Sequence, residues 1–175
     1  SVLFGPIGGL ISAVFYAYAP YRAVNIFVRG AMNEAWASVF FPLIFYFTRK
    51  LILEKKFSWK TFVLLSLSIS GLLLSHNPMA LTFIPFVGMW CLYWLINQKN
   101  KINKIIKLIL SALLGLGITS FYTFPVLFES KLVQIESMFI NYYHYSVHFV
   151  SFYQLFFSNF WGDGPSVWGT NDGMP

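Results

Sequence analysis

The chain has 175 residues, of which 57% are hydrophobic, 21% are aromatic and only 10% are charged. Soluble domains contain about 45–50% apolar and about 25% charged residues, so this composition excludes an ordinary soluble domain, a disordered chain and a nucleic-acid-binding protein. The formal net charge of +6 is explained below by membrane orientation. Cys91 is the single cysteine, so no disulfide can form within the chain.

Five apolar stretches follow one another along the chain, at residues 1–19, 31–48, 61–75, 79–96 and 109–128. A membrane-spanning helix requires roughly 20 mainly apolar residues, and none of the stretches shows the alternation of a membrane β-barrel. We therefore predict an all-α polytopic transmembrane helix bundle with about five spans, since a helix satisfies its own backbone groups in lipid.

The bundle is expected to occupy residues 1–140. Residues 141–175 are predicted to form an external segment of the same domain, with an aromatic interfacial helix followed by a glycine-rich loop. The chain begins within hydrophobic sequence and ends in the glycine-rich stretch, so we expect it to be a fragment of a larger chain. The rest of that chain and the membrane lipid are its expected partners.

The basic residues indicate the orientation of the bundle. Nine of the 12 Lys and Arg residues lie in the loops 49–60 and 97–107, which are separated by two predicted spans and so face the same side. Cytoplasmic loops carry an excess of Lys and Arg. The two lysine-rich loops are therefore predicted to be cytoplasmic, and residues 20–30, residues 75–78 and everything after Phe128 are predicted to be external.

Two external loops contain candidate phosphate-binding residues. Arg22 and Arg29 precede the second span, whose amino-terminal end points outward, and arginine beside a helix amino terminus suits a phosphate. The alternative is that both arginines reach to lipid headgroups and that Glu34 pairs with one of them. His76 and Asn77 lie at the other outward-facing amino terminus, where His76 can bind phosphate or carry a proton; the alternative is a plain helix hairpin.

Asn77 is the predicted amino-terminal cap of the helix that contains residues 79–96, and Pro78 is predicted to occupy its first helical position.

Glu34 and Glu129 are candidate catalytic carboxylates. Either can serve as a general base or a metal ligand at the membrane edge, and Glu129 is followed by Lys131 and Glu136. The alternative for Glu129 is an ordinary carboxylate at the end of a helix.

His144 and His148 are candidate metal ligands because residues four apart share a helix face. No carboxylate or cysteine lies near them in the sequence, and the alternative is a pair of interfacial imidazoles. Asp163 and Asp172 lie in the glycine-rich loop without the spacing of a calcium loop, and their alternative is an ordinary structured loop. The phosphate-binding, dinucleotide-binding and nucleophile-elbow glycine motifs are absent from the sequence. No cofactor is predicted, and a divalent metal is left open.

Four segments together resemble a known family: Pro20-Tyr21-Arg22 with Arg29-Gly30-Ala31 and Glu34, Ser75-His76-Asn77-Pro78, Phe124-Pro125 with Glu129, and the loop from Trp161 to Met174. They resemble the large prokaryotic membrane proteins that carry the 6-pyruvoyl-tetrahydropterin synthase-related membrane domain. Those proteins are similar to the C-type glycosyltransferase (GT-C) fold, whose members transfer a sugar from a polyprenyl-phosphate donor to an acceptor outside the cytoplasm. The resemblance implies a prokaryotic plasma membrane and cell-envelope glycan or polysaccharide assembly.

On this resemblance, Arg22 and Arg29 would contact the donor phosphate, His76 would assist, and Glu34 would orient Arg29. The GT-C pattern also implies a carboxylate in the first external loop, but residues 20–30 contain neither Asp nor Glu, and the catalytic residue is left unknown. Two alternatives remain open, namely a transporter or flippase of lipid-linked sugars and a non-catalytic membrane scaffold. The hypothesis predicts an ion pair of Glu34 with Arg29 or Arg22, and convergence of Arg29 and His76.

Overall fold

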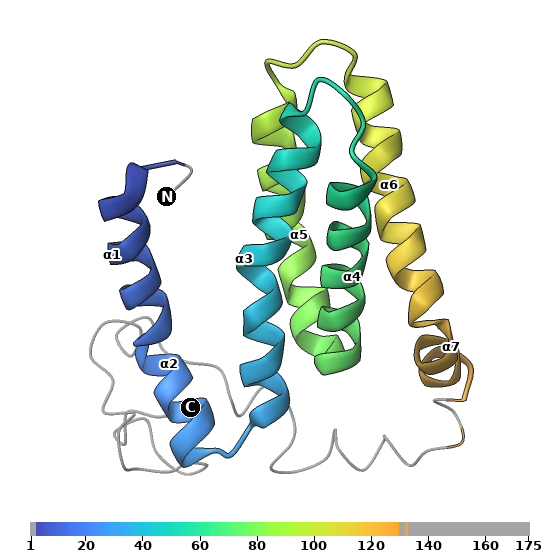
Figure 1. Ribbon diagram of the computed structural model, residues 1–175. Helices are drawn as coiled ribbons and strands as arrows, with labels where there is room; N and C mark the ends of the chain where they lie inside the picture. The colour runs from blue at the N-terminus through green and yellow to red at the C-terminus, as the bar shows by residue number, and fades with distance from the viewer. Residues whose placement is uncertain (1–2, 130–131, 133–175) are drawn as a thin grey trace. The chain divides into compact units, whose positions relative to one another are not determined.

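The computed structural model describes residues 3–129 and Leu132, and the secondary structure of this part of the chain is helical. The elements shown in Figure 1 are α1 (Gly5–Ala17), α2 (Pro20–Ala23), the π-helix η1 (Val24–Val28), α3 (Met32–Leu53), α4 (Trp59–Ser75), α5 (Asn77–Leu95), α6 (Lys101–Ile118) and α7 (Ser120–Phe128). The predicted all-α fold is confirmed for these residues.

The chain divides into two compact units, Ser1–Pro125 and Val126–Pro175. The description that follows concerns the first unit. The boundary predicted after residue 140, and the external segment predicted at residues 141–175, lie outside the described residues.

Two of the described helices, α3 and α5, are long and apolar enough to cross a membrane. Helices α6 and α7 meet the same criterion only as a pair, and the pair is bent by 79°. Helices α1 and α4 are apolar but have only 13 and 17 residues. Two or three helices thus have the dimensions of a span, compared with about five predicted from the apolar stretches.

The fifth predicted stretch, residues 109–128, is not one straight helix. Helix α6 already begins at Lys101, because Lys101, Lys104 and Lys107 recur every three residues and share one side of the helix. The break comes at the buried Thr119, whose hydroxyl donates to the carbonyls of Gly115 and Leu116 at 3.3 and 3.2 Å. Pro125 lies inside α7, after the break.

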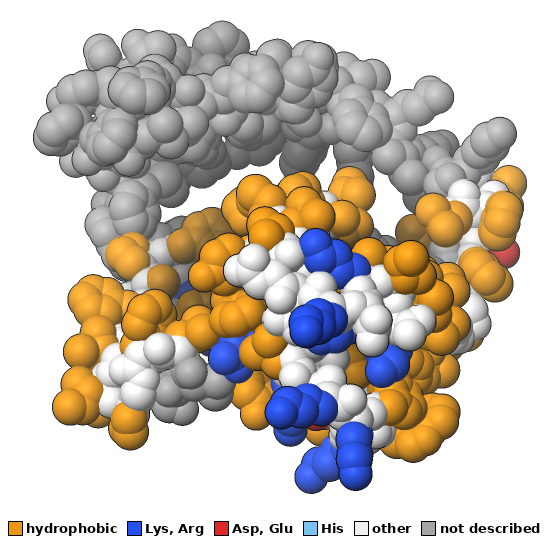
Figure 2. Space-filling view, turned by 90° about the horizontal axis from the view of Figure 1, so that it is seen from above, with side chains coloured by type: hydrophobic (Ala, Val, Ile, Leu, Met, Phe, Trp, Pro, Cys, Tyr) orange, Lys and Arg blue, Asp and Glu red, His pale blue; other side chains and the backbone are white. Residues whose placement is uncertain are grey.

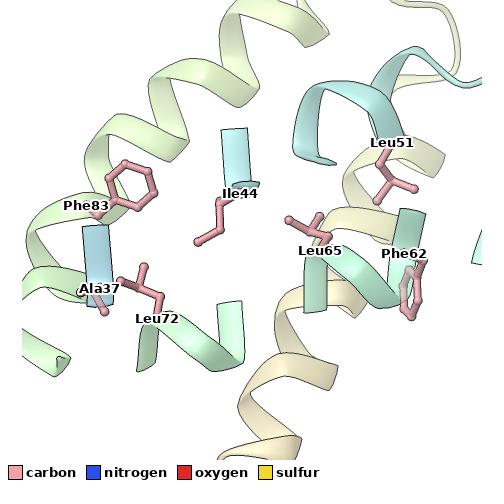
Figure 3. Packing of buried hydrophobic residues seen from close by; sticks show 8 residues of the cluster. Ala37, Ile44, Leu51, Phe62, Leu65, Leu72 and Phe83 are labelled. Carbon is pink, nitrogen blue, oxygen red and sulfur yellow. The ribbon is translucent and has the colours of Figure 1, made fainter. Parts of the chain in front are cut away.

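Helices α3 to α6 form the helix bundle. Helix α4 packs against both α3 and α6, and α5 packs against α3. Figure 3 shows the core, in which apolar side chains of α3, α4 and α5 meet: Ala37, Ile44, Leu51, Phe62, Leu65, Leu72 and Phe83. Each of these side chains lies on the side of its helix that faces the neighbouring helices. The apolar side chains thus mark the faces through which the helices pack.

Small hydroxyl residues are buried in this bundle while large apolar residues are exposed. Ser66 and Ser70 of α4 are buried, and the Ser70 hydroxyl donates to the Gly115 carbonyl of α6 at 3.0 Å. A Cβ atom at Gly115 would lie 3.0 Å from the Ser66 carbonyl oxygen, a tight contact that would push the two helices apart, so glycine favours this approach. On α5, by contrast, Leu81 and Leu92 are 71% and 65% exposed. Small residues at helix contacts and large apolar residues outside are typical of helices packed in lipid.

The two ends of the bundle differ in charge. At the end that is uppermost in Figure 1, called the lysine end, α3 and α5 finish and α4 and α6 begin. There Lys104 Nζ donates to the Ile52 carbonyl at 2.5 Å and to Gln98 Oε1 at 2.6 Å, which ties the two lysine-rich loops together. The two lysine-rich loops therefore lie at the same end of the bundle. His76 lies at the opposite end of α4, called the site end.

Candidate functional site

The carboxylate of Glu34 organises the site end of the bundle. Glu34 lies in the first turn of α3 and accepts hydrogen bonds from the Tyr21 hydroxyl at 2.9 Å and from Asn25 Nδ2 at 2.9 Å. Arg29 donates to both carboxylate oxygens, each at 3.2 Å. The Glu34 side chain is only 12% exposed, so its charge requires this number of donors. The predicted ion pair with Arg29 is confirmed.

The π-helix η1 brings the donors to Glu34. Asn25 is 3% exposed, and its side chain both donates to Glu34 and accepts from Arg29 Nη1 at 2.9 Å. Gly30 adopts a positive φ of 62°, and the Ala31 amide donates back to the Asn25 carbonyl at 2.7 Å. This closure turns the chain so that the beginning of α3 faces the residues that precede it. π-helical turns are frequent at functional sites.

Tyr21 and Asn25 received no role from the sequence. The available signal was Asn25 itself, a lone amide within the apolar run Val24 to Val28. A buried amide requires hydrogen-bond partners, and its nearest carboxylate in the sequence is Glu34.

Arg22 lies on another side of the same cluster. Its guanidinium carbon is 5.5 Å from the centre of the Tyr16 ring, and its buried Nε has no hydrogen-bond partner among the described residues. The Tyr16 hydroxyl donates to the Ser38 carbonyl, which lacks its helical donor because residue 42 is proline. Arg22, Tyr16, Glu34 and Ser38 line a pocket of about 180 Å³.

His76 caps α5 and faces the beginning of α3. Its Nδ1 accepts from the Met79 amide at 3.3 Å, so His76 is the cap residue. The prediction that Asn77 is the cap was wrong by one residue, because the imidazole reaches the amide three residues on as a shorter cap side chain would. Asn77 begins the helix, and its buried Oδ1 has no partner among the described residues.

A second pocket joins the amino-terminal ends of α3 and α5. It has a volume of about 250 Å³, and its lining consists of Gly30, Ala31, Met32, Asn33, Glu34 and His76. Glu34 therefore borders both pockets of the site end. The positive ends of two helix dipoles face this region, and such ends favour anions.

An apolar groove runs along the bundle between α5 and α6. Its volume is about 420 Å³, and residues of α3 and α4 line it as well. Cys91 of α5 and Ala112 of α6 contribute small side chains to its lining, and Gly88 of α5 contributes only backbone. A Cβ atom at Gly88 would meet no atom within 4 Å. Ligand pockets generally measure about 300–1,000 Å³, so the groove is large enough for part of an apolar ligand.

The remaining candidates belong to the second compact unit or lie outside the described residues. Glu129 belongs to the second compact unit. Lys131, Glu136, His144, His148, Asp163 and Asp172 lie outside the described residues. In the part of the chain that the structure describes, no group of three or more His, Cys, Asp or Glu residues is placed to hold a metal ion.

Comparison with known proteins finds a bacterial relative. The chain is 26% identical over 127 residues to an uncharacterized protein of Lactococcus lactis subsp. cremoris (strain MG1363). The match covers 70% of this chain and 20% of the relative, so the chain spans about one fifth of the length of the curated relative it matches. No family model and no solved structure matches the chain.

Proposed function

We propose that this chain is part of an integral membrane protein that binds a polyprenyl-phosphate sugar at the site end and takes part in glycosyl transfer there. The observation that carries the proposal is the pocket shared by the amino-terminal ends of α3 and α5. Glu34 and His76 line this pocket, Arg29 is bound to Glu34, and an apolar groove lies along the same bundle. An amphiphile with an anionic headgroup requires such a combination of polar and apolar surfaces.

The proposed arrangement in the membrane has about five spans and places the site end outside. Helices α3 and α5 run in the same direction, so a chain that crosses twice that way must return between them. Helix α4 is the connecting segment and runs antiparallel to both. The excess of Lys and Arg at the lysine end supports a cytoplasmic position for that end. The proposed location is the plasma membrane of a prokaryote.

Each side chain of the site has a proposed role. Arg29 is 50% exposed at its side chain and can turn part of its guanidinium to a phosphate while Glu34 holds it. Arg22 and His76 supply further donors, and Asn77 supports the second helix end. Glu34 already accepts four hydrogen bonds, which suits it to orient Arg29 rather than to take a proton. Glu129 remains the other candidate carboxylate.

The groove is the proposed place for the polyprenyl tail. Its polar lining is limited to Thr48 and the thiol of Cys91, so a hydrocarbon chain loses no hydrogen bonds on entering. The buried hydroxyls Ser66, Ser70 and Ser111 each donate to a carbonyl of their own helix. They therefore form no polar path along the bundle, which favours a binding site over a transport route for sugar headgroups.

Binding of a polyprenyl-phosphate sugar to the purified protein tests the proposal. Arg29→Ala should weaken binding about ten- to a hundredfold, because one charged hydrogen bond contributes about 1.5–3 kcal/mol. Arg29→Lys should restore only part of the affinity, since lysine lacks the planar fork. Equal affinity of the wild type and both variants would remove Arg29 from the site.

A double variant controls for the charge that Arg29→Ala leaves behind. Without arginine, the Glu34 carboxylate would repel a phosphate by itself. Arg29→Ala combined with Glu34→Gln removes this negative charge and keeps an amide oxygen for Tyr21 and Asn25. Weak binding by the double variant attributes the loss to the arginine, whereas full recovery would show that Arg29 only neutralises Glu34.

A further inference from the structure

The lysine end carries a concentrated positive charge that the proposed function does not use. Nine Lys and Arg residues lie there with the single carboxylate of Glu54: Arg49, Lys50, Lys55, Lys56, Lys60, Lys99, Lys101, Lys104 and Lys107. Figure 2 looks onto this end and shows the Lys and Arg side chains gathered together, with hydrophobic side chains around them. The charge on this surface favours an anionic partner.

Some of these cations have structural roles. Lys104 holds the end of α3 and the loop before α6 through Ile52 and Gln98. Lys107 Nζ lies 5.3 Å from the centre of the Phe57 ring. The Glu54 carboxylate is turned to the Thr61 hydroxyl at 2.7 Å rather than to a cation. The positive charge at this end is therefore not neutralised by ion pairs among the described residues.

Arg49 and Trp94 form a cation–π pair with unused donors. The guanidinium carbon of Arg49, on α3, lies 4.6 Å from the centre of the Trp94 ring, on α5. Arg49 Nε and Trp94 Nε1 are both buried without a hydrogen-bond partner in the described structure. One turn earlier on α5, Trp90 Nε1 donates to the Phe45 carbonyl at 2.9 Å. Of these two tryptophans of α5, Trp94, which lies nearer the lysine end, is therefore the one whose indole N–H is unused.

The chemistry of the pair defines its ligand. Guanidinium and indole nitrogens donate hydrogen bonds and accept none, and buried donors without acceptors are rare in proteins. The missing group must supply acceptor oxygens and, in this positive field, a negative charge. Leu92, Tyr93 and Ile96 beside Trp94 are 65%, 65% and 63% exposed. A ligand with hydrocarbon chains next to its anionic oxygens matches both surfaces.

We propose that Arg49 and Trp94 bind the phosphate of an anionic phospholipid at the lysine end of the bundle. The planar guanidinium contacts the phosphate oxygens, the indole N–H donates to the same headgroup, and the surrounding lysines attract it. The acyl chains of the lipid lie along the exposed apolar residues of α5. This site is independent of the proposed sugar-donor site at the other end.

The test measures thermal unfolding of the purified protein with added phosphatidylglycerol and, separately, phosphatidylcholine. The difference between the two lipids reports headgroup binding, and a general destabilisation by a variant cancels from it. Phosphatidylglycerol should stabilise the wild type more than phosphatidylcholine. Arg49→Lys keeps the charge but loses the planar stack, and Trp94→Phe keeps a ring but loses the N–H. Titration should show each variant binding phosphatidylglycerol about tenfold more weakly.

Lys56→Ala is the matched control. Lys56 is exposed at the same end, and no interaction found in the described part of the chain joins it to Arg49 or Trp94. It should change the affinity by less than about twofold, the size of a screened surface charge. An equal loss in Lys56→Ala and Arg49→Lys would overturn the site in favour of diffuse attraction. Wild-type affinity in Arg49→Lys and Trp94→Phe would overturn it as well. Equal stabilisation by inorganic phosphate or by polyglutamate would overturn the assignment to a lipid.

Discussion

At the site end of the bundle, the carboxylate of Glu34 accepts hydrogen bonds from Tyr21, Asn25 and Arg29, whereas at the lysine end nine cations accompany Glu54 alone. The first arrangement is specific in geometry and nearly balanced in charge. The second is strongly unbalanced, and its single carboxylate bonds to a hydroxyl. Charge at the site end therefore organises local structure, while the lysine end presents a net positive surface, for which the partner proposed here is an anionic lipid.

The largest expected effect concerns which end faces the cytoplasm. Lys55 and Met32 are exposed residues at the lysine end and the site end. In a Cys91→Ala background, cysteine at position 32 should react with a membrane-impermeant maleimide added to intact cells, and cysteine at position 55 should not react until the cells are opened. Reaction of position 55 in intact cells would reverse the orientation derived from the positive charges.

The next largest expected effect is the loss of stability when the carboxylate at either end of the bundle is removed. Glu34→Ala leaves Arg29, Asn25 and Tyr21 without their acceptor and should lower the free energy of unfolding by about 3 kcal/mol. Glu54→Ala removes a single hydrogen bond from Thr61 and should cost about 1 kcal/mol. Thermal or denaturant unfolding of both variants in one detergent provides the comparison. Equal losses would show that the cluster around Glu34 contributes no more than an ordinary side-chain hydrogen bond.

The smallest expected effect is the loss of stability when the cap of α4 or of α5 is removed. Ser58 caps α4 at the lysine end and His76 caps α5 at the site end. Ser58→Ala and His76→Ala should each lower stability by about 1 kcal/mol, and His76→Asn should recover most of the loss. Only His76→Ala should also weaken binding of the polyprenyl-phosphate sugar. An equal change in binding in Ser58→Ala would assign the effect of His76 to stability alone.

Much of the bundle followed from the order of apolar residues and from the caps. Stretches 61–75 and 79–96 lie within two residues of the observed limits of α4 and α5, because Ser58 and the turn at His76 interrupt the helices there. The limits of α6 could not be predicted from the apolar stretches. A hydropathy pattern assigns Lys101 to Lys107 to a loop, although lysines that share one side of a helix are compatible with helix. The bend at Thr119 depends on the burial of its side chain against the bundle.

The cluster around Glu34 was also predictable only in part from the sequence. The pairing of Glu34 with Arg29 is a local contact between residues five apart, so sequence spacing was sufficient to suggest it. The role of Asn25 depends on η1, whose π-helical hydrogen bonding has no reliable signature in sequence. The contact of Tyr16 with Ser38 depends on how α1 meets α3, because Pro42 frees a carbonyl without indicating which donor will reach it.

The sequence by itself determined the helical class, the stretches suited to a membrane and the separation of charge between the two ends. These properties depend on composition and on neighbours within a few turns, where helix periodicity and solvation act directly. Only the tertiary structure decided that Glu34 gathers four hydrogen bonds, that Arg49 stacks on Trp94 and that α5 and α6 leave a groove between them. These features join residues from separate elements, and whether such residues meet depends on how closely the helices pack, as the approach of α6 to α4 at Gly115 illustrates.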